Sequence, residues 1–199
     1  MNPEDVNTLI RQRRSVFPKD YTGEKAADSI IWQLLENANW APTHKHTEPW
    51  RFKVFCREGL QLFAQYQAEK YRQQHWGTAG FLEAKYQKLL TKPLKCSHII
   101  AIGVHHAPGS PVPEIEEVAA VSCAVQNILL SAPVYGLGAY WSTGGVTYLE
   151  EARAFFGLQP EDKLLGFIYL GVTKKALPVS QRGPIADKVD WVTGGHTGD

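Results

Sequence analysis

The stretch N-W-A-P-T-H-K-H-T-E-P-W, residues 39–50, separates a predicted helix from a predicted strand, and the rest of the chain is arranged around it. Pro42 and Pro49 fix the backbone φ angle at two points and restrict the residue before each. Residues 44–48 place two imidazoles, an ammonium group, a hydroxyl and a carboxylate close together. A stiff, polar loop between two regular elements is a common place for a binding site. We therefore expect this loop to contribute to one.

Hydrophobic periodicity predicts the elements on either side of the loop. Residues 24–39 carry apolar side chains at i, i+3 and i+4 spacing, which is typical of a helix with one buried face. Residues 51–56 alternate in polarity, as a half-buried strand does. Further strands are expected near residues 99–104, 138–142 and 164–172. Since helices separate these strands, the predicted fold class is α+β with one central sheet.

Other helices are expected along the chain. Asn2 caps a first helix that ends near residues 13–15. Residues 58–74 and a further segment ending near residue 90 predict two helices rich in Gln, Tyr and Lys. These two helices are either a cover over a site or an exposed pair packed by its own aromatic rings. Residues 149–156 are expected to form a short helix.

Residues 114–132 predict a long helix that opens with three glutamates, at 114, 116 and 117, and is apolar on all sides from residue 118. Large aliphatic side chains form one face, and alanines with one cysteine form the other. Such a helix must be covered by the sheet, a cofactor or a second subunit. The uncharged run continues to residue 149, but Pro133 and Gly136 interrupt it before a membrane-spanning length accumulates. We expect a buried central helix followed by a buried strand, and no membrane span.

Composition excludes several classes of function. The 199 residues are 44% hydrophobic and 21% charged, as in ordinary globular proteins. A net charge of +1 with no basic stripe argues against nucleic-acid binding. Three widely spaced cysteines without a C-x-x-C motif predict free thiols in a reducing compartment. The polar start, residues 2–5, does not resemble a signal peptide. We expect one cytoplasmic domain over residues 1–199, with an extended tail from about residue 174.

Several common site types are absent from the sequence. Residues 136–138 read G-L-G but lead into a strand, which argues against a dinucleotide-binding fingerprint. No P-loop motif and no G-x-S-x-G motif occur. A metal site remains an alternative, with ligands from His44, His46 and Glu48 or from residues 105–106. That alternative predicts a metal-assisted hydrolase.

Arg13, Arg14 and Ser15 form the first chemical cluster. Guanidinium groups donate pairs of hydrogen bonds to phosphate oxygens, and a hydroxyl adds a further hydrogen bond. Basic side chains also stabilise the C-terminal end of a helix, so spacing alone leaves both interpretations open.

Taken in order, five motifs resemble those of the FMN-dependent nitroreductase family, particularly its short NAD(P)H oxidoreductase-like branch. They are R-R-S at 13–15, A-P-T-H-K at 41–45, E-P-W-R-F at 48–52, G-L-G-A-Y-W-S-T-G at 136–144 and D-K-L-L-G-F-I-Y-L-G at 162–171. Each motif is weak alone, but the ordered set is specific and the resemblance spans residues 4 to about 192. The resemblance implies a mostly antiparallel sheet of four or five strands flanked by helices. It also implies a homodimer with the long helix in the interface and FMN bound at two interface sites.

The resemblance implies a set of FMN-contacting residues, namely Arg13, Arg14, Ser15, Trp40, His44, Trp141, Ser142, Thr143 and Arg182. The Arg-Arg-Ser cluster and the late arginine would hold the phosphate. Trp40 would approach from the partner subunit, and residues 141–143 would lie beside the flavin ring. The tail would wrap over the partner.

The chain departs from the family pattern at three places. Glu48 stands where glutamine is common, and Phe17 where a basic residue is common. A lysine often found near the late arginine is replaced by Ser180 or Gln181. These departures bear on affinity and substrate preference more than on FMN binding itself.

The implied activity is hydride transfer from NAD(P)H to FMN, followed by reduction of a small oxidised acceptor such as a nitroaromatic or a quinone, in a ping-pong scheme. Because the flavin carries the chemistry, no side chain is predicted as a catalytic acid or base. A flavin-binding or sensing protein with little turnover is the alternative within the same resemblance.

Overall fold

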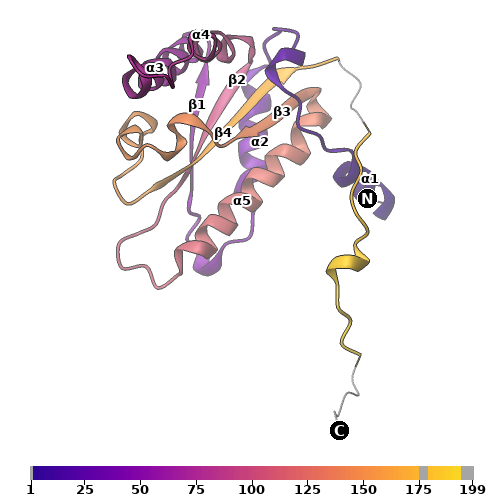
Figure 1. Cartoon of the computed structure of the whole chain (residues 1–199). Coiled ribbons are helices and arrows are strands. Elements are labelled where there is room, and N and C mark those ends of the chain that lie inside the picture. Colours follow the sequence, from indigo (N-terminus) through magenta and orange to yellow (C-terminus); the bar gives the residue numbers. More distant parts are fainter. Residues whose placement is uncertain (1, 175–178, 194–199) are drawn as a thin grey trace.

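A four-stranded antiparallel sheet lies at the centre of the computed structural model, which describes residues 2–174 and 179–193 (Figure 1). The strand order is β1-β2-β4-β3. The strands are Trp50–Cys56 (β1), His98–Val104 (β2), Leu137–Ser142 (β3) and Lys163–Val172 (β4). All three pairings are antiparallel. The predicted α+β class and antiparallel sheet are confirmed, and each predicted strand lies within two residues of its expected position.

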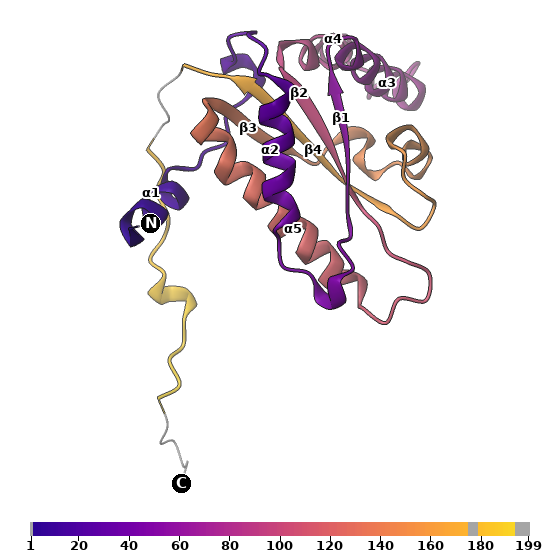
Figure 2. The same ribbon diagram turned by 180° about the vertical axis from the view of Figure 1, so that it is seen from behind.

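Helices cover both faces of the sheet. They are Pro3–Gln12 (α1), Asp28–Asn39 (α2), Glu58–His75 (α3), Glu83–Thr91 (α4) and Glu114–Ser131 (α5). Figures 1 and 2 show α2 and α5 on one face and α3 with α4 at the other. The helix α1 stands beside the sheet and has no buried residue.

Two hydrophobic cores hold these layers together. Leu34 of α2 and Ile128 of α5 pack against Ile168 of β4 in the first core. Phe63 of α3 and Phe167 of β4 belong to the second core, with ring centroids 4.9 Å apart. Burial of one such side chain contributes roughly 1.5–3 kcal/mol. The two central strands are therefore covered on both faces, which explains their continuous apolar sequence.

The predicted start of the second helix was wrong. Residues 24–39 were expected to be helical, but α2 begins at Asp28. The preceding backbone is bound elsewhere: the Thr22 amide donates to the Val172 carbonyl, and the Ala26 amide donates to Ser97 Oγ at 2.7 Å. These bonds to the sheet hold the segment extended until the helix begins.

The long helix α5 is not covered on all sides within one chain. Its aliphatic face is buried, but Ala119 and Cys123 are exposed, and the Ile115 side chain is 72% exposed. By length and composition alone, residues Glu114–Tyr135 pass the test for a membrane span. The sheet and α2 nevertheless cover one side of this helix. Ala120 and Ala124, by contrast, are buried in the first core.

The segment after β3 also differs from the prediction. A single short helix was expected over residues 149–156, but the chain forms three 3₁₀ turns, at Gly145–Tyr148, Glu150–Ala152 and Ala154–Phe156. The last turn ends at Gly157 with φ 76°. Side chains in the second core, including Phe156, fix these turns more strongly than local helix propensity does.

Candidate functional site

The Arg-Arg-Ser segment lies along the free edge of the sheet. It follows α1, and the Val16 amide donates to the Ala139 carbonyl of β3 at 2.9 Å. The hydroxyl of Tyr21 lies 2.8 Å from the carbonyl oxygens of both Val16 and Tyr169. Burial raises the pKa of Tyr21, so its hydroxyl stays protonated and can donate. Tyr21 thus holds the segment that follows Ser15 against the sheet, a role that the sequence did not reveal.

Two glycines make room for this contact. A Cβ atom on Gly171 would lie 2.2 Å from the Tyr21 ring, and one on Gly138 would lie 2.8 Å from the Val16 side chain. Both glycines lie in strands, and a side chain at either position would displace residues 16–21. The glycines of β3 and β4 therefore allow residues 16–21 to lie close against the sheet, and this sets the position of the Arg-Arg-Ser segment.

The donors of this segment fit a phosphate group. Arg14 lines a small cavity of about 170 Å³ with Val16 and the start of β3. Its Nη1 donates to the carbonyl oxygens of Arg11 and Arg13 at 2.6 and 2.8 Å. Guanidinium groups and the exposed Ser15 hydroxyl are of the type that binds phosphate oxygens. The donor chemistry therefore suits the phosphate end of a mononucleotide.

The end of β3 presents the second predicted group. The Trp141 indole donates to the Leu165 carbonyl at 3.2 Å, which fixes the ring against β4. Gly166 has φ 120°, and a Cβ there would lie 2.3 Å from the Ser142 carbonyl, so glycine is needed for β3 to approach. Ser142 is half-buried and Thr143 is exposed. These residues end the strand with hydroxyls and backbone groups open to a ligand.

The polar loop is under backbone strain. Lys45, His46 and Glu48 have positive φ angles of 52°, 53° and 44°. Non-glycine residues in this region cost free energy and cluster at functional sites. The Glu48 amide donates to Thr43 Oγ1 at 3.2 Å, which stabilises the turn. The buried Trp50 anchors the end of the loop, and its indole donates to Asn39 Oδ1 at 2.9 Å.

Trp40 and His44 do not meet the other predicted residues within one chain. Trp40 is 79% exposed and donates to Glu36 of its own helix, so it does not anchor the loop. His44 Nδ1 lies 2.6 Å from Glu116 Oε2 in the first turn of α5. Figure 2 shows this loop at the N-terminal end of α5, whereas α1 lies near the other end.

The late arginine forms a third, separate group. Arg182 is exposed, and its Nη1 donates to Ser180 Oγ at 2.6 Å and to the Gln181 carbonyl at 2.9 Å. The described part of the tail, residues 179–193, extends away from the sheet and carries exposed apolar side chains such as Trp191 (Figure 1). Nothing in residues 2–174 covers these side chains.

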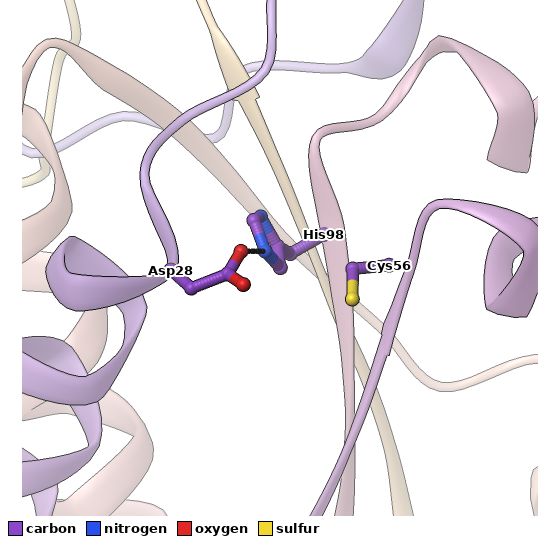
Figure 3. A group of neighbouring side chains, drawn as sticks. All are labelled: Asp28, Cys56 and His98. Atoms are coloured by element: carbon purple, nitrogen blue, oxygen red, sulfur yellow. Dashed lines mark hydrogen bonds and ion pairs between the residues drawn. The ribbon is translucent and has the colours of Figure 1, made fainter.

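The expected metal ligands are not gathered together. His105 lies 2.7 Å from Asp162, and His106 pairs with the buried Glu117. Within residues 2–174 and 179–193, three ligand types converge at Asp28, Cys56 and His98 instead (Figure 3). The metal alternative therefore finds no support at the His44 loop.

The Asp28–Cys56–His98 cluster is already satisfied internally. His98 Nε2 lies 3.1 Å from Asp28 Oδ1, its Nδ1 lies 2.9 Å from Ser97 Oγ, and Arg57 Nη2 donates to Asp28 Oδ2 at 2.8 Å. Burial lowers the pKa of His98, so the imidazole is neutral at pH 7. These contacts use the lone pairs that a metal would need, and we assign them to fixing the start of α2 on β2.

Two further cavities lie where α4 faces the end of β3. The first, of about 370 Å³, is lined by Ser142 and Gly144 together with α3 and α4. The second, of about 460 Å³, is lined by Phe17 and Tyr140, whose ring centroids are 4.6 Å apart. Lysines line both cavities, and neither lining contains a carboxylate. The sequence prediction missed this lysine-rich region, although lysines at 85, 88, 92 and 95 repeat at helical spacing.

The family of the chain follows from comparison with known proteins. The model of the Nitroreductase family matches residues 10–172. The chain belongs to the nitroreductase family. It is 29% identical over 192 residues to the Escherichia coli (strain K12) protein named "Putative NAD(P)H nitroreductase YdjA", covering 95% of this chain and 98% of that protein.

Solved structures of this family share the fold. A nitroreductase-like family protein from Bacillus cereus has a TM-score of 0.80 and 27% identity, covering 95% of this chain and 96% of that one. A structure from Desulfovibrio desulfuricans, described as a putative nitroreductase in complex with FMN, has a TM-score of 0.68 and 25% identity, covering 98% and 99%. The resemblance read from the ordered motifs is confirmed at the level of family and fold.

Proposed function

We propose that this nitroreductase-family chain is an FMN-dependent oxidoreductase that takes a hydride from NAD(P)H and reduces a small oxidised acceptor, such as a nitroaromatic or a quinone. The observation that carries the proposal is the phosphate-type donor set of residues 13–15, fixed against β3 in a chain of this family. FMN, when bound, accepts the hydride and passes the electrons on, which is chemistry no side chain here supplies.

The protein's own residues bind and orient the cofactor in this proposal. Arg13, Arg14 and Ser15 hold the phosphate end. Trp141, fixed by its bond to the Leu165 carbonyl, and the hydroxyls of Ser142 and Thr143 limit where the flavin ring can lie. Since one cleft would admit the donor and then the acceptor, we propose a ping-pong scheme. We assign no side chain as acid or base.

We propose that the complete site forms between two copies of the chain. Within one chain, Trp40 bonds to Glu36, His44 to Glu116 and Arg182 to Ser180. These three residues therefore lie in other parts of the described chain than residues 13–15. The exposed face of α5, which carries Ile115 at 72% exposure together with Ala119 and Cys123, offers apolar surface of the kind that a permanent dimer buries. A second copy related by two-fold symmetry would bring the loop of one subunit to the sheet edge of the other.

We also propose a cytoplasmic location for this enzyme. Cys56, Cys96 and Cys123 are free, as expected in a reducing compartment. Burial raises the pKa of the Cys96 thiol to about 12, so that thiol is unreactive.

The deciding experiment is an absorption spectrum of the purified protein, followed by anaerobic addition of NADPH or NADH. Visible flavin bands that bleach on addition support the proposal, and recovery of the bands when a nitroaromatic or quinone is added completes the cycle. Bands that persist with both donors would favour a flavin-binding protein without turnover. A colourless protein that fails to take up added FMN would refute the proposed function.

A further inference from the structure

The two cavities between α4 and β3 form one lysine-rich region, which we call the lysine cleft. Its lysines are Lys19, Lys85, Lys88, Lys92 and Lys95. Lys88 and Lys92 line both cavities, so the two spaces adjoin. Among the described residues, none of these lysines forms an ion pair with a carboxylate, whereas Lys163 and Lys174 do so with Glu114 and Glu24.

Lys92 is the most unusual of these side chains. It is half-buried, and its ammonium group lies 4.4 Å from the Tyr169 ring centroid and 5.0 Å from that of Tyr140. Burial lowers its pKa, and the neighbouring positive charge of Lys88 adds to this effect. A partly buried cation without an anion is unfavourable, and cation–π contacts compensate only in part. The geometry therefore suits an incoming anion that would sit beside Lys88 and Lys92.

Hydrogen bonds from α3 fix the position of α4 beside the cleft. Gln67 of α3 donates to the Leu89 carbonyl at 3.0 Å, and the Tyr71 hydroxyl donates to the Gly80 carbonyl at 2.9 Å. The Leu82 amide donates to the Tyr71 hydroxyl at 2.8 Å. These bonds fix α4 on α3 and so fix the direction of its lysines.

The cleft also adjoins the proposed flavin position. Ser142 and Gly144, at the end of β3, line the first cavity, and a Cβ on Gly144 would meet no atom within 4 Å. The aromatic pair Phe17 and Tyr140 forms an apolar wall of the second cavity. A ligand that combines flat rings with phosphate groups fits this combination of aromatic wall and lysine rim.

We propose that the lysine cleft binds the phosphate groups of the nicotinamide dinucleotide donor, and that it makes the enzyme prefer NADPH to NADH. The proposal rests on the proposed function, because a donor must lie beside the flavin for a hydride to pass. NADPH differs from NADH by a 2′-phosphate, which adds charge close to −2 at neutral pH. Several unpaired lysines at one cleft favour the more highly charged donor.

The first test uses ligands that cannot transfer a hydride. Adenosine 2′,5′-bisphosphate and adenosine 5′-monophosphate are titrated calorimetrically into the purified protein, with and without FMN. We expect the bisphosphate to bind at least about tenfold more tightly at low salt, and the difference to shrink as salt is raised. Equal affinity for the two ligands would overturn the proposal.

The second test compares matched double variants. Lys88→Met/Lys92→Met removes both shared charges while keeping side-chain length, and Lys163→Met/Lys174→Met removes two charges elsewhere. We expect the first variant to lose the preference for the bisphosphate and for NADPH through a raised KM, and the second to keep both. The single variant Lys88→Met, at an exposed position, provides the readout if the double variant is unstable.

These outcomes separate the two proposals. If FMN binds and is reduced, but the Lys88/Lys92 variant keeps the wild-type KM ratio for NADPH and NADH, the lysine-cleft proposal is wrong and the proposed function stands. If no FMN binds while the bisphosphate preference remains and is lost in the variant, the cleft is a phosphate site and the proposed function is wrong.

Discussion

At the scale of single residues, the candidate site depends on a few polar side chains fixed by packing. Arg14 is oriented by backbone carbonyl oxygens of its own segment, and Tyr21 holds that segment to β3 and β4. A binding site held within a fraction of an ångström needs such support from residues that never touch the ligand. Tyr21 therefore supports the candidate site through the position of the segment that follows Ser15.

The first prediction concerns the phosphate donors. Arg13→Ala/Arg14→Ala should weaken FMN binding by at least about tenfold, because each charge-assisted hydrogen bond contributes up to about 1.5–3 kcal/mol before solvent screening. The measurement is the dissociation constant from fluorescence quenching of added FMN. Arg11→Ala, which removes an exposed arginine one turn earlier, serves as the control. Unchanged FMN affinity in the double variant would contradict the phosphate assignment.

The second prediction concerns pH. Burial lowers the pKa of His98 from its ordinary value of 6.5, and the hydrogen bond to Asp28 opposes this only in part. The unfolded chain therefore takes up the proton first, so the stability contributed by neutral His98 is present above pH 6.5 and is lost as the pH falls toward the lower folded value. His98→Gln should flatten the decrease in urea-unfolding free energy between about pH 7 and pH 5.

Cys56→Ser is the control for this experiment, because it changes the same cluster but leaves His98 buried. It should keep the wild-type dependence on pH. The hydrogen bond from Arg57 lowers the pKa of Asp28, so its contribution is lost only at still lower pH, below its ordinary value of 3.8. An identical pH slope in wild type and His98→Gln would show that His98 does not contribute.

At the scale of elements, β3 and β4 position the site through glycines, which have no side chain. Each of three glycines leaves space for one neighbour. Val16 lies against Gly138, the Ser142 carbonyl against Gly166, and the Tyr21 ring against Gly171. Strand propensity alone disfavours glycine in these positions. Their presence is explained by the close approach of the edge segment and of the neighbouring strand.

The third prediction follows from this packing. Gly171→Ala places a methyl group 2.2 Å from the Tyr21 ring, so residues 16–21 must move. We expect a loss of about 1–3 kcal/mol of stability, as for other overpacked positions. Weaker FMN binding should accompany it, since Ser15 lies in the displaced region. Thermal unfolding and FMN titration measure the two effects.

Gly59→Ala is the matched control in α3. A Cβ at Gly59 meets Phe55 at 3.8 Å, which is ordinary contact, and alanine favours a helix over glycine. This variant should be as stable as wild type or slightly more so. If Gly171→Ala behaves in the same way as Gly59→Ala, Tyr21 is not held as tightly as we infer.

At the scale of the whole molecule, one chain divides the proposed FMN contacts into separate groups. Residues 13–15 and 141–143 lie at the β3 edge, the His44 loop lies at the N-terminal end of α5, and Arg182 lies in the extended tail. In the dimer that we propose, a second copy packs on the exposed side of α5 and on the apolar tail residues. Dimerisation and cofactor binding should therefore be linked.

The fourth prediction tests this linkage. Ala119→Glu introduces a charge on the exposed small-residue side of α5 and should convert a dimer of two 22.2 kDa chains into monomers with weaker FMN binding. Ala84→Glu, on the exposed surface of α4, should remain dimeric with wild-type affinity. Light scattering after size-exclusion chromatography gives the mass. A wild-type protein that is monomeric at micromolar concentration would refute the dimer proposal.

The sequence by itself determined the strands, the helices α1, α3, α4 and α5, and the family. Periodicity of two or of 3.6 residues reflects which side chains face the core, and this pattern is local. The resemblance of the ordered motifs, including those at 13–15 and 136–144, to the nitroreductase family then implied an FMN site.

Only the tertiary structure decided which distant segments meet. The start of α2 is delayed by bonds to Ser97 and Val172, and Tyr21 packs over Gly171, neither of which follows from local pattern. Lys88 of α4 and Lys92 just after it come to line one cavity with Phe17 and Tyr140, because α3 fixes the position of α4. Such neighbours depend on strand register and helix packing, which involve residues far apart in sequence, and so no local signal encodes them.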